Sequence, residues 1–205
     1  MKLLVTLGVA LALFSTVASL RCLESVPGLV DTQKQCPALE TTCAAATVRV
    51  TAVGNTQDVT VKGCAKPQEC VQSLSVNLGT ARTTISLTCC STDLCNIVAP
   101  PAYGDSAPNG LECFTCEGQD CTKTLQCLGI EDRCLETSVK VGEQTVVLKG
   151  CVSKNACVAQ GSEQLSQYLG VGYSCCQGNL CNSAKRVAQN IFLLLLPLAS
   201  VRFLF

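Results

Sequence analysis

Cysteine is the residue type in this sequence that could take part in the most kinds of chemistry, and eighteen of the 205 residues are cysteine. Cys113-Phe-Thr-Cys116 has the spacing of a redox dithiol, of half a zinc site, or of two structural half-cystines. A redox pair is expected beside a βαβ pattern, which the sequence does not show. Zinc binding would compete with disulfide formation in an oxidising compartment, and the chain has no histidine to serve as a ligand. We therefore predict structural disulfides.

Other catalytic chemistry lacks its usual side chains. The absence of histidine excludes a Ser-His-Asp triad and a Cys-His pair. The acidic residues Glu131, Asp132 and Glu136 could be paired carboxylates or a calcium site, but we expect them to be solvated loop charges. We predict that the protein is not an enzyme and that it uses no cofactor and no metal.

The two ends of the chain have the composition of targeting signals. Residues 1–19 combine Lys2, an apolar run and small residues, which predicts a signal peptide cleaved after Ser19 or after Ala18. At the other end, Asn182-Ser183-Ala184 precedes a polar spacer and an apolar tail, the order of a GPI attachment signal. We predict lipid attachment at Asn182, with Ser183 as the alternative, and a propeptide over 183–205. The protein would then lie on the extracellular face of the plasma membrane, or be secreted if the anchor is absent.

The cysteines also show that one unit occurs twice. Cys22, Cys36 and Cys43 recur at an offset of 91 residues as Cys113, Cys127 and Cys134. Each unit closes on two adjacent cysteines, four residues and Cys-Asn, at 89–96 and again at 175–182. Between the units, the proline- and glycine-containing segment 98–110 predicts a linker. The expected domains are therefore 20–97 and 111–182.

The segments between the cysteines must supply the elements that position them, and they alternate as strands do. Residues 47–53 and 57–62 predict a hairpin that bends at Gly54-Asn55. Residues 136–141 and 144–149 predict the matching hairpin around Gly142-Glu143. A further hairpin is expected over 73–78 and 83–88 with Gly79 in its turn, whereas 162–169 could form a short helical turn. The predicted class is all-β, small and disulfide-rich.

These spacings resemble the three-finger LU domain shared by the urokinase receptor, lymphocyte surface antigens and snake neurotoxins. The second unit has the full ten-cysteine pattern, from Cys113-Phe-Thr-Cys116 to Cys175-Cys176, Cys181 and Asn182. Sequence alone permits very many pairings, so the connectivity is what the resemblance implies. For the second unit it implies Cys113–Cys134, Cys116–Cys121, Cys127–Cys151, Cys157–Cys175 and Cys176–Cys181. It also implies that Asn96 and Asn182 bond to the backbone near each domain hub.

The first unit departs from this pattern because it lacks the second and third cysteines and has Ser25 where Cys116 lies in the second unit. Both partners of one bridge are therefore missing together. The resemblance implies four remaining bonds and no free thiol: Cys22–Cys43, Cys36–Cys64, Cys70–Cys89 and Cys90–Cys95. We expect the first finger, residues 23–35, to be more mobile than its stapled counterpart.

Charge and resemblance together indicate a binding protein. Basic and acidic residues are equal in number, so there is no basic footprint for nucleic acid. The resemblance implies two tandem three-finger domains in a GPI-anchored receptor or adhesion-type protein. Such a protein would recognise an extracellular protein ligand through its finger loops. Its GPI lipid would anchor it in the outer leaflet of the plasma membrane. The alternatives are a secreted phospholipase-inhibitor-like protein and a toxin-like modulator. No residue is assigned to the ligand, and the exposed candidates are Arg49, Arg82, Tyr103, Tyr168 and Tyr173.

Overall fold

The computed structural model describes residues 19–25, 30–70, 73–104, 106–158 and 172–183. The expected signal peptide, apart from its last residue, lies outside the described residues, and so does the expected tail from residue 184 onward. The possible helical turn at 162–169 and Tyr168 also lie outside them.

Both repeats are built from antiparallel hairpins, so the predicted all-β class is confirmed. The strands of the first repeat are β1 (Arg21–Glu24), β2 (Thr32–Gln35), β3 (Thr42–Ala52), β4 (Asn55–Ala65), β5 (Ser73–Asn77) and β6 (Ala81–Cys90). Those of the second are β7 (Pro108–Glu117), β8 (Asp120–Leu128), β9 (Arg133–Val141), β10 (Gln144–Val152) and β11 (Ser174–Cys176). The short helices are η1 (Pro67–Glu69) and α2 (Lys154–Val158). Within the described part of the chain, no helix combines the length and hydrophobicity that a bilayer span needs.

The three predicted hairpins are present, with one correction to a turn. The β3–β4 hairpin turns at Val53-Gly54, because Ala52 pairs directly with Asn55. The bend expected at Gly54-Asn55 is therefore one residue too late. Val53 and Gly54 both have positive φ, 50° and 79°, which is the requirement of a two-residue type I′ turn. Glycine meets that requirement without strain, whereas a β-branched residue such as Val53 rarely adopts it.

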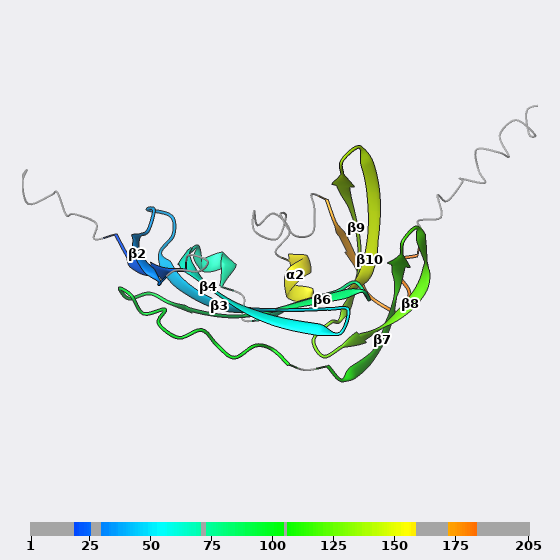
Figure 1. Cartoon of the computed structure of the whole chain (residues 1–205), viewed down its shortest axis with the longest axis horizontal. Coiled ribbons are helices and arrows are strands. Elements are labelled where there is room, and N and C mark those ends of the chain that lie inside the picture. The colour runs from blue at the N-terminus through cyan, green and yellow to red at the C-terminus, as the bar shows by residue number, and fades with distance from the viewer. Residues whose placement is uncertain (1–18, 26–29, 71–72, 105, 159–171, 184–205) are drawn as a thin grey trace, which may run out of the picture.

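A single sheet runs through both repeats (Figure 1). Its seven strands have the order β11-β9-β10-β5-β6-β3-β4, while β1–β2 and β7–β8 form separate two-stranded hairpins. The junction is an antiparallel pair in which Cys151 and Val152 of β10 lie opposite Asn77 and Val76 of β5. The described residues of the expected linker are irregular up to Ala107, and β7 takes its last three residues. The two repeats therefore share backbone pairing as well as a covalent connection.

Candidate binding surface

Every cysteine of the chain is in a disulfide, and the nine bonds are the same pairs that the family resemblance implies. Each repeat has one group of three cysteines whose sulfur atoms lie within 4.8 Å of one another. The group in the first repeat is Cys22, Cys36 and Cys64, and the second repeat has the equivalent group. Because these sulfurs are already bonded as disulfides, they have no thiolate to offer a metal ion. Cys113 and Cys116 are in different bonds, so they do not form a redox dithiol.

The asparagine after the last cysteine of each repeat is buried and joins three backbone groups. Asn96 accepts a hydrogen bond from the N–H of Leu23 and donates to the carbonyls of Leu23 and Ala44, each at 2.9 Å. Asn182 makes the equivalent three bonds, also at 2.9 Å, to the backbone of the second repeat. Each side chain thus connects the first finger of its repeat to the second.

Glu131 was expected to be a solvated loop charge, and this expectation is wrong. It is a buried structural residue. Its side chain is 0% exposed. One carboxylate oxygen accepts hydrogen bonds from Ser75 Oγ and from Nε of Arg82, both at 2.7 Å. The other accepts from Asn77 Nδ2 at 3.3 Å and from the backbone N–H of Leu128 at 2.9 Å. A carboxylate of the second repeat is therefore neutralised by side chains of the first.

The other two residues of the acidic cluster have separate partners. Asp132 pairs with Arg133 and accepts a bond from the backbone N–H of Lys154 at 2.7 Å. Glu136 lies on β9 and pairs with Lys149 of β10 at 3.1 Å. The three carboxylates therefore serve three different interactions and do not converge on one cation.

Gly150 is what allows the two repeats to approach so closely. A Cβ at this position would lie 2.0 Å from the carbonyl oxygen of Asn77 and 3.0 Å from Cα of Leu78. A Cβ on the repeat-equivalent residue, Gly63, would meet no atom within 4 Å. Beyond the paired strands, the N–H of Ser153 donates to the carbonyl of Ser75 at 2.9 Å. The two backbones are thus too close at Gly150 for a side chain to fit between them.

An apolar cluster lies beside this backbone contact, which we call the interdomain core. Its buried members come from the second repeat: Leu135, Val152, Ala156 and Tyr173. Leu74, Val76 and Leu78 of the first repeat pack against them. Tyr173 was expected to be exposed, but it is 5% exposed and its hydroxyl donates to the carbonyl of Ala156 at 2.7 Å. Burial raises the pKa of this tyrosine, and the residue belongs to the core.

The first-repeat sheet has one apolar face that continues outward from the interdomain core. Strand pairing places Leu74 of β5, Ile85 of β6, Val48 of β3 and Val59 of β4 in a single row. Neighbouring rows on the same face add Val76, Leu87, Ala46, Val50 and Val61. We call these nine residues the apolar sheet face.

Exposure along the apolar sheet face increases from the core towards the sheet edge. Leu74 and Val76 pack on the interdomain core. Val50, Val59 and Val61 are 39%, 46% and 49% exposed. Three valines on two adjacent strands therefore present apolar surface to solvent.

The opposite, polar face of the same sheet is partly covered by the linker (Figure 1). Thr47 Oγ1 donates to the carbonyl of Pro100 at 2.6 Å, and Thr84 Oγ1 donates to the carbonyl of Tyr103 at 3.2 Å. Thr47 and Thr84 are both buried, as is Ser75 in the same layer. A half-exposed antiparallel sheet usually buries its apolar face and solvates its polar one. In this sheet the linker covers the polar face at Thr47 and Thr84, and the apolar face is open at Val50, Val59 and Val61.

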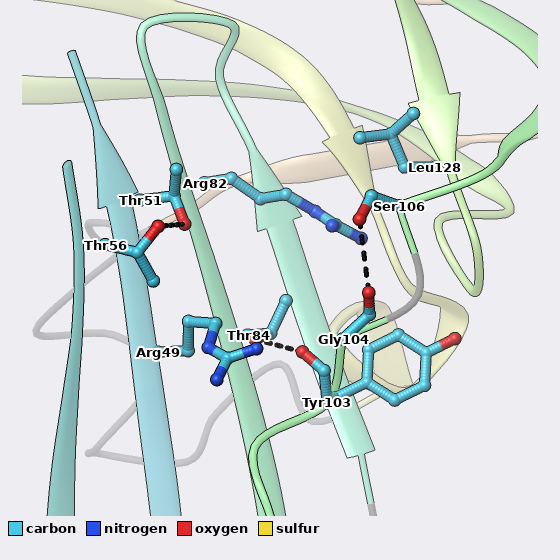
Figure 2. Close-up of a pocket in the computed structure, with 9 residues that line it drawn as sticks. All are labelled: Arg49, Thr51, Thr56, Arg82, Thr84, Tyr103, Gly104, Ser106 and Leu128. Atoms are coloured by element: carbon cyan, nitrogen blue, oxygen red, sulfur yellow. Dashed lines mark hydrogen bonds between the residues drawn. The ribbon is translucent and has the colours of Figure 1, made fainter. Parts of the chain in front are cut away.

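A hollow of about 290 Å³ lies between the polar face and the linker, and Figure 2 shows the residues that line it. It brings together three of the candidate residues, Arg49, Arg82 and Tyr103. Arg49 is bonded to Asp58 through two 2.8 Å hydrogen bonds, and these hold the pKa of that aspartate below its usual range. Since Arg82 is paired with Glu131, both guanidinium groups are already neutralised by carboxylates.

A second groove, of about 480 Å³, separates the first and second fingers of the second repeat. Its lining includes the tip residues Gly118 and Gln119, the strand residues Gln144–Val147, and the Glu136–Lys149 ion pair. As in the first hollow, the opposite charges lie in contact with each other. The charged groups of both hollows therefore act in ion pairs within the chain.

Each repeat matches a known family of domains. Residues 19–98 match the u-PAR/Ly-6 domain, and residues 111–182 match the family described as snake toxin and toxin-like protein.

Three relatives illustrate the similarity. The chain is 27% identical to the urokinase plasminogen activator surface receptor of Rattus norvegicus over 179 residues, covering 80% of this chain and 53% of the relative. It is 35% identical to sperm acrosome membrane-associated protein 4 of Bos taurus over 81 residues, covering 36% of this chain and 62% of the relative. It is 26% identical to protein Bouncer of Danio rerio over 102 residues, covering 46% of this chain and 82% of the relative. The chain spans between about a third and about half of the length of the urokinase receptors that it matches.

One such domain is recognised in each repeat, and both repeats have the cysteine framework and hairpins of the same fold. The chain therefore carries two three-finger domains in tandem, a u-PAR/Ly-6 domain followed by a snake toxin-like domain.

Proposed function

We propose that this protein is a non-enzymatic binding protein of the cell surface, of the receptor or adhesion type, which recognises an extracellular protein ligand. The observation that carries the proposal is the exposed part of the apolar sheet face, where Val50, Val59 and Val61 lie open to solvent. Contiguous apolar surface on an extracellular domain marks a site of protein interaction. The ligand would contribute apolar side chains, because the charged groups of both hollows are already paired within the chain.

A pair of matched variants tests this surface. Val50→Lys places a charge on the apolar sheet face, whereas Val147→Lys places one on β10 of the second repeat at nearly the same exposure, 39% against 38%. Proximity labelling on intact cells would first identify the ligand, and its affinity for both purified variants would then be measured. We expect Val50→Lys to weaken binding about tenfold or more, as for a residue in the buried centre of an interface. Equal binding by the two variants would refute the assignment of this surface.

The second part of the proposal is a GPI anchor whose attachment residue is Ser183 and not Asn182. Asn182 is 4% exposed, makes three side-chain hydrogen bonds to the backbone, and its carbonyl accepts a bond from Lys149 Nζ at 2.7 Å. The enzyme that attaches the lipid must reach the peptide bond after the attachment residue, and Ser183 is exposed. The names of two relatives, a surface receptor and a membrane-associated protein, support a membrane location.

Phosphatidylinositol-specific phospholipase C should release the protein from intact cells. Mass spectrometry of the released carboxyl-terminal peptide should find the lipid remnant on Ser183. Recovery of residues 191–205 from the membrane-bound protein would show that the anchor is absent. A remnant on Asn182 would show that burial in the finished fold does not decide where attachment occurs.

The match of the second repeat to toxin-like proteins favours a second candidate, a soluble modulator of another protein. The same experiment separates the two. A soluble modulator would accumulate in the medium of untreated cells, and its amount there would not change with the phospholipase.

A further inference from the structure

The outer edge of β4 is a long and regular strand edge. β4 (Asn55–Ala65) is the last strand of the seven-stranded sheet. Its pairing with β3 runs without a register shift from Asn55 opposite Ala52 to Ala65 opposite Thr42. The strand therefore contains no bulge, and its eleven residues include no proline.

One hydrogen bond shows which backbone groups of β4 point away from β3. The N–H of Ser25 donates to the carbonyl of Lys62 at 3.2 Å, so the backbone of Lys62 faces outward. Because successive residues of a strand face opposite sides, Thr56, Asp58 and Thr60 also face outward. Among the described residues, no backbone group bonds to these three, and their side chains are exposed. They leave a row of donors and acceptors next to the apolar sheet face.

Between Asn55 and Val61 this edge has few of the features by which proteins usually prevent strand addition. Short length, bulges, proline and charged side chains are the common devices. Asp58 is the only charged residue between Asn55 and Val61, and its carboxylate is bonded to Arg49 on the neighbouring strand. The edge strand at the other end of the sheet, β11, has only three residues. An open β4 edge is therefore poised to pair with another strand.

We propose that the occupant is a second copy of this chain, whose β4 pairs antiparallel with the first about a two-fold axis at Val59. This register places Asp58 opposite Thr60 of the second copy, so the outward backbone groups of both residues find partners. It also places Val59 opposite Val59 and Gln57 opposite Val61. The two apolar sheet faces then form one continuous face across the junction.

Neighbouring registers are less complementary. An axis at Asp58 would place two carboxylates directly opposite each other, and like charges across a strand pair are destabilising. An axis at Thr60 would pair Val59 with Val61, but it would place Lys62, whose carbonyl is already bonded to Ser25, opposite Asp58 and leave Thr60 with Thr60 as the single outward pair clear of Lys62. An axis at Gln57 would leave Val61 without a partner. The axis at Val59 leaves two outward pairs, Asp58 with Thr60 in each direction, clear of Lys62 and still places valine opposite valine, with Lys62 opposite Thr56 only at the ends of the pair.

The row of apolar side chains supports the same occupant. It begins at Leu74 in the interdomain core and ends at Val59 on the open edge. In the symmetric pair, the row from each copy meets the row of the other at Val59. The pair would thus extend an interface that the chain already uses between its own repeats. This proposal does not depend on the identity of the ligand.

The test uses the full chain expressed on cells and purified in mild detergent, with dimerisation measured by analytical ultracentrifugation. The wild type should show a concentration-dependent monomer–dimer equilibrium. Val59→Lys and Val59→Glu should each weaken dimerisation about tenfold or more, because like charges would face each other across the axis. An equimolar mixture of the two variants should recover a dimer with one copy of each. Val147→Lys is the matched control, since Val147 is also partly exposed but lies on β10.

A second variant tests the strand pairing directly. Thr60→Pro removes an outward N–H and leaves the bonds to β3 intact, which is the kind of position where an edge strand tolerates proline. It should abolish the dimer while thiol titration still finds no reactive cysteine. A wild type that stays monomeric, a dimer unaffected by Val59→Lys, or charge variants that do not recover on mixing would each overturn the proposal.

Discussion

Replacing Gly150 with alanine should loosen the contact between the two domains, whereas the same change at Gly63 should not. Both glycines precede a cysteine in the same Lys-Gly-Cys sequence, one in each repeat. An alanine methyl at Gly150 would overlap the carbonyl of Asn77, at 2.0 Å, and backbone atoms cannot rotate away as a side chain can. β10 and β5 must therefore separate.

The size of the change in stability follows from the contacts that are lost when β10 and β5 separate. Forcing an extra methyl into a packed site destabilises a protein by about 1–3 kcal/mol. Weakening the bond between Ser153 N–H and the carbonyl of Ser75 would add about 0.5–1.5 kcal/mol. At Gly63 the methyl meets no atom within 4 Å, and alanine in a strand is favoured over glycine by roughly 0.5–1 kcal/mol. The two variants should therefore change stability in opposite directions.

Thermal unfolding with the disulfides intact measures the difference. For a chain of this size, each kcal/mol corresponds to roughly 2–4 °C in the midpoint. Hydrogen exchange should show the Ser153 amide losing protection in Gly150→Ala and keeping it in Gly63→Ala. Equal midpoints with a protected Ser153 amide in both variants would refute the close backbone contact between the domains.

Three further predictions concern single interactions. Glu131→Ala should lower the free energy of unfolding by about 3 kcal/mol, because it leaves the guanidinium partner of a buried ion pair without its counter-charge; an unchanged urea midpoint would contradict this. Asn96→Ala and Asn182→Ala should each destabilise their own domain by about 1–3 kcal/mol, since three backbone groups lose a partner, and a neutral result for either would show that water replaces the side chain. The hydrogen bonds from Arg49 lower the pKa of Asp58 in the folded state. The small stabilisation from this exposed pair is therefore fully present above the unfolded pKa of about 3.9, and it is lost as the pH falls through the pKa of the folded state. Carboxyl NMR titration should find that pKa below its usual range in the wild type and closer to it in Arg49→Ala.

The hairpins could be predicted from sequence because the information that specifies them is local. Alternation of β-branched and polar residues over 47–53 and 57–62 fixes two strands, and the glycine between them fixes a turn. The one-residue error arose because Gly54 suits either central position of the turn. The observed turn also requires Val53 to adopt a positive φ, which local preference disfavours.

The contact between the domains could not be predicted, because its residues look ordinary in their own segments. Glu131 stands beside Asp132 in a charged loop, and its partners lie about 50 residues earlier, at Ser75, Asn77 and Arg82. Gly150 has the same local sequence as Gly63, yet only one of them meets another strand. The burial of Tyr173 likewise depends on strands of both repeats that meet around it. Non-local contacts of this kind leave no periodic signal in a single sequence.

The arrangement of bonds has a consequence for proteolysis in the linker. Each disulfide joins two cysteines of the same repeat, while the repeats are held together by the β5–β10 strand pair, the interdomain core and the buried Glu131. A protease that cuts the linker would break none of these contacts, so a nicked molecule would keep its shape and both of its halves. In a denaturing gel without reductant, the same molecule would fall into two fragments.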